Sequence, residues 1–306
     1  MWGRKNLTFK ENLGLVYFVL PFISIVENKV SLICSILFGK SEYKIKIKNT
    51  IIKIPRNRFN SLRDLLACLT YSISYSFDSS GNLEILFDEN SKFKISLNEL
   101  SLEDINLLEL LHFGSKYCAN FLNDVSFPNI RKQTYRIISE NGKKIIITSN
   151  GIRFFLDSIH AGNTIIETFV REIHSINPKI DWNNKIVVDV GAECGDTPLY
   201  FASMGANVFA FEPLKKHFEF FKKNMSLNPT LSEKITPINA AIGKDEQLKF
   251  YVSDDNDESG SLSASFVSNK QGKNFKYELV DGYKLETARK KFRINHIDLL
   301  KMDCKE

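Results

Sequence analysis

The sequence lacks the features that mark several classes of protein. Its five cysteines are widely spaced and never form a CxxC pair, which indicates neither a disulfide framework nor a zinc site. The five histidines are scattered, and the net charge of +5 comes without a long block of like charge. We therefore expect no metal, no nucleic-acid partner and, because the thiols fit a reducing compartment, a cytoplasmic location.

The chain is long and apolar enough for more than one domain. It has 306 residues, of which 43% are hydrophobic, so it can supply two cores. No internal repeat or low-complexity tract interrupts it. We expect a globular protein of two domains.

The longest apolar run near the N-terminus covers residues 13–26 and follows a basic flank. A signal peptide looks similar, but no small-residue cleavage pattern follows and Glu27 interrupts the run. A helix of this length spans about 21 Å, which is less than the roughly 30 Å of a bilayer core. A buried helix is our first interpretation, and a peripheral membrane contact through residues 13–38 is the alternative, so the location is cytoplasmic with possible membrane association.

Residues 41–130 have the pattern of a small α+β unit. Alternating apolar and polar residues predict strands over residues 43–49, 50–55, 72–77, 82–87 and 92–97. Ser61, with Asp64 three residues later, predicts the start of one helix, and Ser101 predicts the start of another over residues 102–113. No group of residues in this unit indicates chemistry.

Three more short strands are predicted over residues 135–139, 143–148 and 151–156. A helix follows from a capping box of Thr164 and Glu167. From Ile186 strands alternate with helices, as in a parallel sheet with crossover helices. The predicted division of the chain is therefore residues 1–40, 41–130, 131–185 and 186–306.

The stretch KIVVDVGAECGDTPLY predicts a buried parallel strand, a glycine turn and a helix. The strand ends at Asp189, and Gly191 and Gly195 let the backbone come close to a ligand. Asp196 and Thr197 are expected to cap the helix that follows. The turn thus places N–H groups at the carboxyl end of the sheet, where open α/β folds bind ligands.

The next strand ends on Glu212, which is placed to accept both ribose hydroxyls of an adenosine. Sites for NAD and for S-adenosylmethionine share such an acid, so the turn decides between them. The pyrophosphate of NAD needs GxGxxG, whereas the second glycine position here is Glu193, a negative charge. S-adenosylmethionine carries an ammonium and a sulfonium, which favour a carboxylate such as Asp189. An NAD-dependent oxidoreductase remains the alternative enzyme.

Several segments, in order and spacing, resemble the FkbM family of S-adenosylmethionine-dependent methyltransferases, and the extension before them resembles that of archaeal members. These segments are VVDVGAECGDTPLYFASMGANVFAFEP, ITPINAAIGKDEQLKFYVS, SGSLS and IDLLKMD. The resemblance implies a class I, Rossmann-like parallel sheet that binds S-adenosylmethionine. It also implies O-methylation of a hydroxyl on a glycan, a glycolipid or another small molecule.

The resemblance also implies which residues bind the cofactor. The loop residues carried over by position are Asp189, Gly191, Ala192, Gly195, Asp196 and Thr197. Glu193 and Cys194 replace the commoner Asn-hydrophobic pair of the family. Glu212 matches the ribose acid, and the turn of Asn239, Ala240 and Ala241 matches the segment beside the adenine.

Two features concern the order of the sheet. Pro237 lies within the third strand, and a proline is tolerated at a sheet edge, where the family has this strand. The fourth strand, residues 297–303, continues in the family as MDxEGxE, but here it reads MDCKE. We therefore expect a sheet that is incomplete at its C-terminal side, and a truncated, non-catalytic remnant is a further alternative.

Two residues are candidates for the general base that a hydroxyl acceptor needs. Asp303 lies at the carboxyl end of the fourth strand, and His160 precedes the helix that leads into the sheet. A structural role is the favoured interpretation of each. The acidic segment of residues 254–260 is interpreted as a solvated connection. The sequence indicates neither the acceptor nor the oligomeric state.

Overall fold

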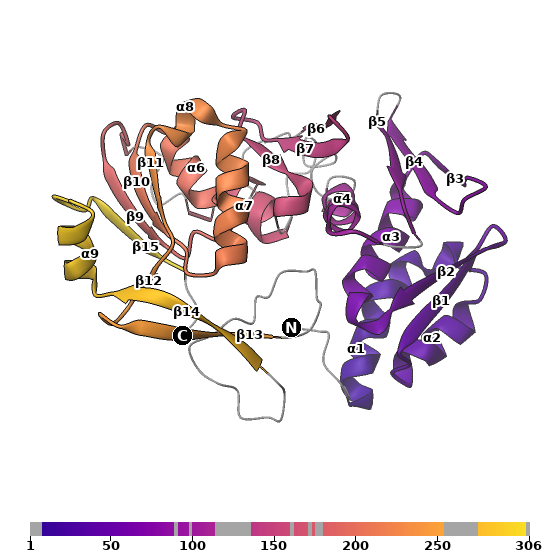
Figure 1. Cartoon of the computed structure of the whole chain (residues 1–306). Coiled ribbons are helices and arrows are strands. Elements are labelled where there is room, and N and C mark those ends of the chain that lie inside the picture. Colours follow the sequence, from indigo (N-terminus) through magenta and orange to yellow (C-terminus); the bar gives the residue numbers. More distant parts are fainter. Residues whose placement is uncertain are drawn as a thin grey trace. The chain divides into compact units, whose positions relative to one another are not determined.

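The computed structural model describes residues 8–88, 91–97, 100–113, 136–159, 162–170, 173–174, 180–253 and 275–303. The chain divides into two compact units, Met1–Phe127 and Pro128–Glu306 (Figure 1). The finer division of the sequence into four segments stays a prediction.

The first unit begins with two short helices and a β-hairpin. These are α1 (Phe9–Val19), the 3-10 helix η1 (Leu20–Ile25), α2 (Lys29–Leu37), β1 (Glu42–Ile47) and β2 (Thr50–Pro55). Thr8 and Glu11 form a capping box that starts α1. Pro21 lacks the N–H that would continue the α-helix, and the chain changes to a 3-10 turn at Leu20.

The predicted buried helix buries only one of its faces. Leu15, Val16 and Val19 are almost fully buried, whereas Leu13 and Tyr17 are 38% and 66% exposed. Among the residues that the structure describes, no helix combines the length and the apolar character needed to cross a bilayer. The peripheral membrane contact stays a prediction.

In the rest of this unit, the ends of the strands agree with the predicted ends to within a few residues. Its elements are η2 (Arg56–Arg58), α3 (Phe59–Tyr71), β3 (Ser74–Phe77), β4 (Leu83–Asp88), β5 (Ser91–Ile95) and α4 (Leu102–Phe113). Ser101 caps α4 as expected. Its hydroxyl accepts a hydrogen bond from the Asp104 N–H and donates one to the Asp104 carboxylate. The predicted cap at Ser61 is wrong, because α3 begins two residues earlier, at Phe59. Asp64 instead accepts hydrogen bonds from Arg63 and lies 2.8 Å from His112 Nδ1.

The second unit begins with the predicted three-stranded antiparallel sheet. It consists of β6 (Arg136–Glu140), β7 (Lys143–Ile147) and β8 (Arg153–Phe155), followed by η4 (Leu156–Ser158). The next element, η5 (Gly162–Val170), is a π-helix. The predicted capping box at Thr164 is wrong, because η5 begins before it and the Thr164 hydroxyl lies 3.3 Å from the sulfur of buried Cys194.

A four-stranded parallel sheet forms the centre of this unit, in the order β11-β10-β9-β15 (Figure 1). Its strands and helices are β9 (Ile186–Val190), α6 (Asp196–Ser203), β10 (Asn207–Phe211), α7 (Lys215–Ser226), α8 (Pro229–Ser232), β11 (Ile235–Ile238) and β15 (Leu299–Met302). Among the described strands β11 is an edge, which confirms the place predicted for Pro237.

A smaller sheet lies between β11 and β15 in the sequence. It pairs β12 (Ala241–Ile242), β14 (Phe275–Tyr283) and β13 (Gln247–Ser253) in that order, and α9 (Leu285–Lys291) leads on to β15. Val188, Val190 and Phe211 form a buried cluster with Ala288 and Ile294. The helix α9 thus packs on the core of the parallel sheet.

Replacing Gly195 by alanine tests the tight packing of the glycine turn. Gly195 has a φ of 89°, and a Cβ there would overlap the ring of buried Phe221. We expect Gly195→Ala to lower the free energy of unfolding by about 2 to 4 kcal/mol, measured by urea denaturation. Gly142→Ala is the control, because Gly142 has a φ of 75° and nothing within 4 Å, so about 1 kcal/mol is expected. Equal losses would contradict the packing explanation.

Candidate functional site

The glycine loop after β9 is held against the end of β10. Gly191, Glu193 and Gly195 have positive φ angles of 87°, 47° and 89°. The N–H groups of Gly191 and Ala192 both donate to the Phe211 carbonyl, at 2.9 and 3.0 Å. Glutamate disfavours the left-handed region that glycine and asparagine accept, so the loop holds Glu193 in a strained conformation.

The helix after the loop begins differently from the prediction. Gly195 is the N-cap of α6 and makes no side-chain cap. Asp196 and Thr197 lie inside the first turn, and their side chains bind buried partners instead. The Thr197 hydroxyl donates to Asp189, and Asp196 accepts a hydrogen bond of 2.5 Å from the Thr168 hydroxyl on η5. The predicted caps are therefore wrong, because these side chains serve tertiary contacts.

Asp189 is fully buried and forms an ion pair that the sequence did not predict. Its Oδ1 lies 3.0 Å from Nζ of Lys301, a side chain that is only 12% exposed. Lys301 stands directly opposite Asp189 in the register of β15 and β9. Because paired residues of neighbouring strands lie on the same face of a sheet, the strand pairing places the Lys301 side chain on the face of Asp189.

Glu212 is almost fully buried, and both of its carboxylate oxygens accept backbone hydrogen bonds. The N–H groups of Glu193 and Leu214 donate to them, each at 2.9 Å. His217 Nδ1 lies 3.8 Å from the same carboxylate. Burial raises the pKa of Glu212 to about 7, against the two backbone hydrogen bonds. In this structure the carboxylate therefore holds the glycine loop and the start of α7 in place.

The loop gathers several carboxyl groups. Burial raises the pKa of Asp196 to about 7, although Lys301 and the Thr168 hydroxyl oppose the rise. The charges of Asp189 and Glu193 raise the pKa values of both Asp196 and Glu212. A site with this concentration of carboxyl groups favours a cationic ligand over a phosphate.

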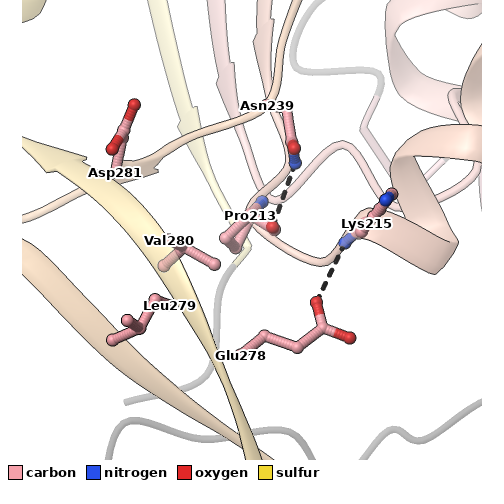
Figure 2. A pocket seen from close by; sticks show the side chains of 7 residues that line it. All are labelled: Pro213, Lys215, Asn239, Glu278, Leu279, Val280 and Asp281. Atoms are coloured by element: carbon pink, nitrogen blue, oxygen red, sulfur yellow. Dashed lines mark hydrogen bonds between the residues drawn. The ribbon is translucent and has the colours of Figure 1, made fainter.

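A cleft of about 520 Å³ opens at the carboxyl ends of β10 and β11, which Pro213 and Asn239 follow (Figure 2). It is lined by Pro213, Lys215, Asn239, Glu278, Leu279, Val280 and Asp281. The Asn239 amide donates to the carbonyls of Glu212 and Pro213, at 2.8 and 3.0 Å. The last four lining residues belong to β14, so the small sheet provides the second wall of the cleft.

The other predicted site residues have three different outcomes. Ala192 and Ala240 are buried within the loops that follow β9 and β11. Asp303 follows β15, and its side chain is 73% exposed, with Oδ2 4.0 Å from Lys301 Nζ. His160 and the acidic segment of residues 254–260 lie outside the described residues.

His174 lies near this site, although it was not among the residues predicted from the sequence. Burial and the charge of Lys301 lower its pKa, while Asp189 and Asp303 act in the opposite direction. These electrostatic partners place the imidazole near the carboxyl ends of β9 and β15. No motif surrounds His174, so only the tertiary structure reveals it.

Comparison with known proteins supports the resemblance noted in the sequence. Residues 189–306 match the model of the methyltransferase FkbM domain. Neither the curated proteins nor the solved structures gave a match. The matched segment contains the glycine loop, Glu212, the cleft and Lys301.

Removing the Lys301 ammonium tests the buried ion pair. We expect Lys301→Met to lower the free energy of unfolding by about 3 to 5 kcal/mol, because Asp189 is left as an uncompensated buried charge. Lys290→Met is the control, since Lys290 and its partner Glu286 are 77% and 79% exposed and such surface pairs contribute little to stability. Similar losses in the two variants, measured by urea denaturation, would contradict the pairing.

The raised pKa of Glu212 predicts a pH dependence of stability. The pKa of Glu212 is about 7 in the folded state, whereas the pKa of a free glutamate side chain is 4.5. The stability that Glu212 contributes is fully present below the pKa of the free side chain. It is lost as the pH rises through the pKa of the folded state. The free energy of unfolding of wild type, relative to Glu212→Gln, should therefore fall between pH 5 and 8, on the order of 1 to 3 kcal/mol.

Glu286→Gln is the control for this pH series, because Glu286 is an exposed carboxylate whose pKa is lowered by Lys290. Glu286 is already ionised at the start of the pH range from 5 to 8. The difference in free energy of unfolding between Glu286→Gln and wild type should therefore stay constant across this range. A constant difference for Glu212→Gln as well would show that Glu212 is ionised throughout this range.

Proposed function

Since the chain carries a methyltransferase FkbM domain over residues 189–306, we propose that it transfers a methyl group from S-adenosylmethionine to an acceptor hydroxyl. The observation that carries this proposal is the glycine loop, which joins the buried Asp189 to Glu212 at the carboxyl ends of β9 and β10. The acceptor class, a glycan, glycolipid or other small molecule, rests on the family resemblance.

The order of the strands supports a class I, Rossmann-like fold. By their place in the domain, β9, β10, β11 and β15 are the first to fourth strands of the sheet, and their spatial order is third, second, first, fourth. The order reverses between β9 and β15, and open α/β sheets bind ligands at such a switch point. The glycine loop follows β9 directly and lies at this place.

The cleft at the carboxyl ends of β10 and β11 fits the adenosine part of the donor. Its wall of Pro213, Leu279 and Val280 offers apolar surface for a base, and Asn239 and Asp281 offer polar groups at its side (Figure 2). Glu212 can exchange a backbone N–H for the ribose hydroxyls, which would keep its carboxylate hydrogen-bonded. Adenosine alone fits NAD equally, and the negative loop is what favours the sulfonium donor.

The residues of this chain hold the reactants and accept a proton. The donor supplies an activated methyl group, and transfer needs the acceptor oxygen in line with it at about 3 to 3.5 Å. Asp303, exposed after β15, and His174 are the described groups near Lys301 that can accept the hydroxyl proton. The lowered pKa of His174 leaves its imidazole neutral at pH 7, as a base requires. His160 remains a candidate from the sequence.

Calorimetric titration tests the donor site. We expect the wild-type chain to bind S-adenosylhomocysteine and to leave NADH unbound. Glu212→Ala should weaken binding of S-adenosylhomocysteine by about 10- to 100-fold, because the hydrogen bonds between its carboxyl group and the ribose hydroxyls are lost. Glu219→Ala is the control, since Glu219 lies on α7 with its side chain 54% exposed.

Other outcomes of this titration would favour one of the two alternative functions. Tight binding of NADH without S-adenosylhomocysteine would favour an oxidoreductase. Binding of neither ligand by a folded chain would favour a non-catalytic remnant. A thermal denaturation curve for each variant separates lost binding from lost folding.

A further inference from the structure

One side chain of α7 connects the glycine loop to the antiparallel sheet of β6, β7 and β8. Asn224 is fully buried, and its amide group makes hydrogen bonds to three backbone groups. Its Oδ1 accepts from the Phe155 N–H of β8 at 3.1 Å. Its Nδ2 donates to the carbonyls of Ser158, at the end of η4, and of Cys194, in the glycine loop, each at 3.0 Å.

These three partners require an amide side chain. A backbone N–H can only donate and a carbonyl can only accept, so the side chain must present one acceptor and two donors. Asparagine offers this set, whereas an aspartate carboxylate has no donor and an apolar side chain has neither kind of group. The network therefore fixes both the residue type of Asn224 and the orientation of its amide.

The next turn of α7 carries a second buried asparagine with a different task. Asn228 is 7% exposed, and its Nδ2 donates to the carbonyls of Arg153 and Asn224, both at 2.8 Å. Its Oδ1 accepts from the Arg153 N–H at 3.0 Å. Among the described strands β8 is an edge of its sheet, so α7 supplies hydrogen-bond partners to this edge. Asn228 serves the edge and its own helix, whereas Asn224 also reaches the glycine loop.

The hydrogen bond from Asn224 fixes one peptide unit of the glycine loop. The Cys194 carbonyl accepts it at one side of this unit, and at the other side the Gly195 N–H donates to the Ala192 carbonyl at 2.8 Å. Because a peptide unit is planar, it cannot rotate without breaking both hydrogen bonds. The unit follows Glu193, whose φ of 47° is disfavoured, and it resists the movement that would relax this residue.

We propose that Asn224 is a positioning residue for the donor site, which holds the glycine loop in its binding shape by anchoring it to β8 and η4. The inference rests on the proposed function. Because β8 and η4 lie before residues 189–306, a segment outside the matched domain then takes part in donor binding. A loop that already has its bound shape loses less conformational freedom on binding, and this raises the affinity.

Alanine variants of the two asparagines test the proposal in the full chain. Asn224→Ala and Asn228→Ala each remove hydrogen bonds to three backbone groups, so both should lower the free energy of unfolding in urea denaturation. In calorimetric titration, Asn224→Ala should weaken binding of S-adenosylhomocysteine by about 5- to 20-fold, because fewer folded molecules have the binding shape of the loop. Asn228→Ala should change this affinity by less than about 2-fold, because it loses no contact with the loop.

Hydrogen exchange of the ligand-free chain gives a readout that a general loss of stability does not produce. In Asn224→Ala, the amides of residues 191–195 should exchange faster than in Asn228→Ala and in wild type, because the loop opens locally. Saturation of Asn224→Ala with S-adenosylhomocysteine should slow this exchange again, because the ligand selects the bound shape.

A second variant of the same residue covers the case in which Asn224→Ala does not fold. Asn224→Asp keeps the size of the side chain and an oxygen for the Phe155 N–H. The carboxylate has no donor for the carbonyls of Ser158 and Cys194. Asn224→Asp should therefore show the same loss of affinity for S-adenosylhomocysteine.

The outcomes separate this inference from the proposed function. Equal losses of affinity in the alanine variants of Asn224 and Asn228 would indicate a general loosening of α7. Unchanged affinity, or unchanged exchange of the loop amides, in the Asn224 variants would remove this residue from the donor site. Each of these results overturns the inference while the proposed function stands. A folded wild-type chain that does not bind S-adenosylhomocysteine overturns the proposed function, and the inference with it.

Discussion

The ion pair between Asp189 and Lys301 joins the two strands at the place where the order of the parallel sheet reverses. Asp189 lies near the carboxyl end of β9, the first strand of the sheet, and Lys301 lies directly opposite it on β15. A fully buried carboxylate is costly without a partner, so the position of β15 beside β9 and the charge at the base of the loop depend on each other. The loop, the start of α6 and the electrostatics of the site all follow from this contact.

Above the pair, the glycine loop is fixed by contacts from several parts of the chain. The Phe211 carbonyl and the Glu212 carboxylate hold its N–H groups, and η5 reaches it from the other side through Thr164 and Thr168. The loop therefore has little freedom to rearrange.

The cleft depends on the small sheet as much as on the parallel one. Asn239 and Pro213 come from the carboxyl ends of the parallel strands, but Glu278 to Asp281 come from β14. Val280 and Phe250 of the small sheet pack with Leu214 and Ala241 in a shared core cluster. This packing holds β14 against the segment that follows β10, which forms the opposite wall of the cleft.

Local sequence pattern determined the strand, glycine turn and helix after Ile186, because β-branched residues and glycines fix the backbone over a few residues. It also placed Asp189, Glu212 and the edge strand with Pro237. The helix caps expected at Ser61, Thr164 and Asp196 failed, since tertiary contacts engage Thr164 and Asp196, and α3 begins before Ser61. Only the tertiary structure decided the partner of Lys301, the place of His174 and the second wall of the cleft. Strand register and packing bring those residues together from distant parts of the chain, and no local pattern encodes that pairing.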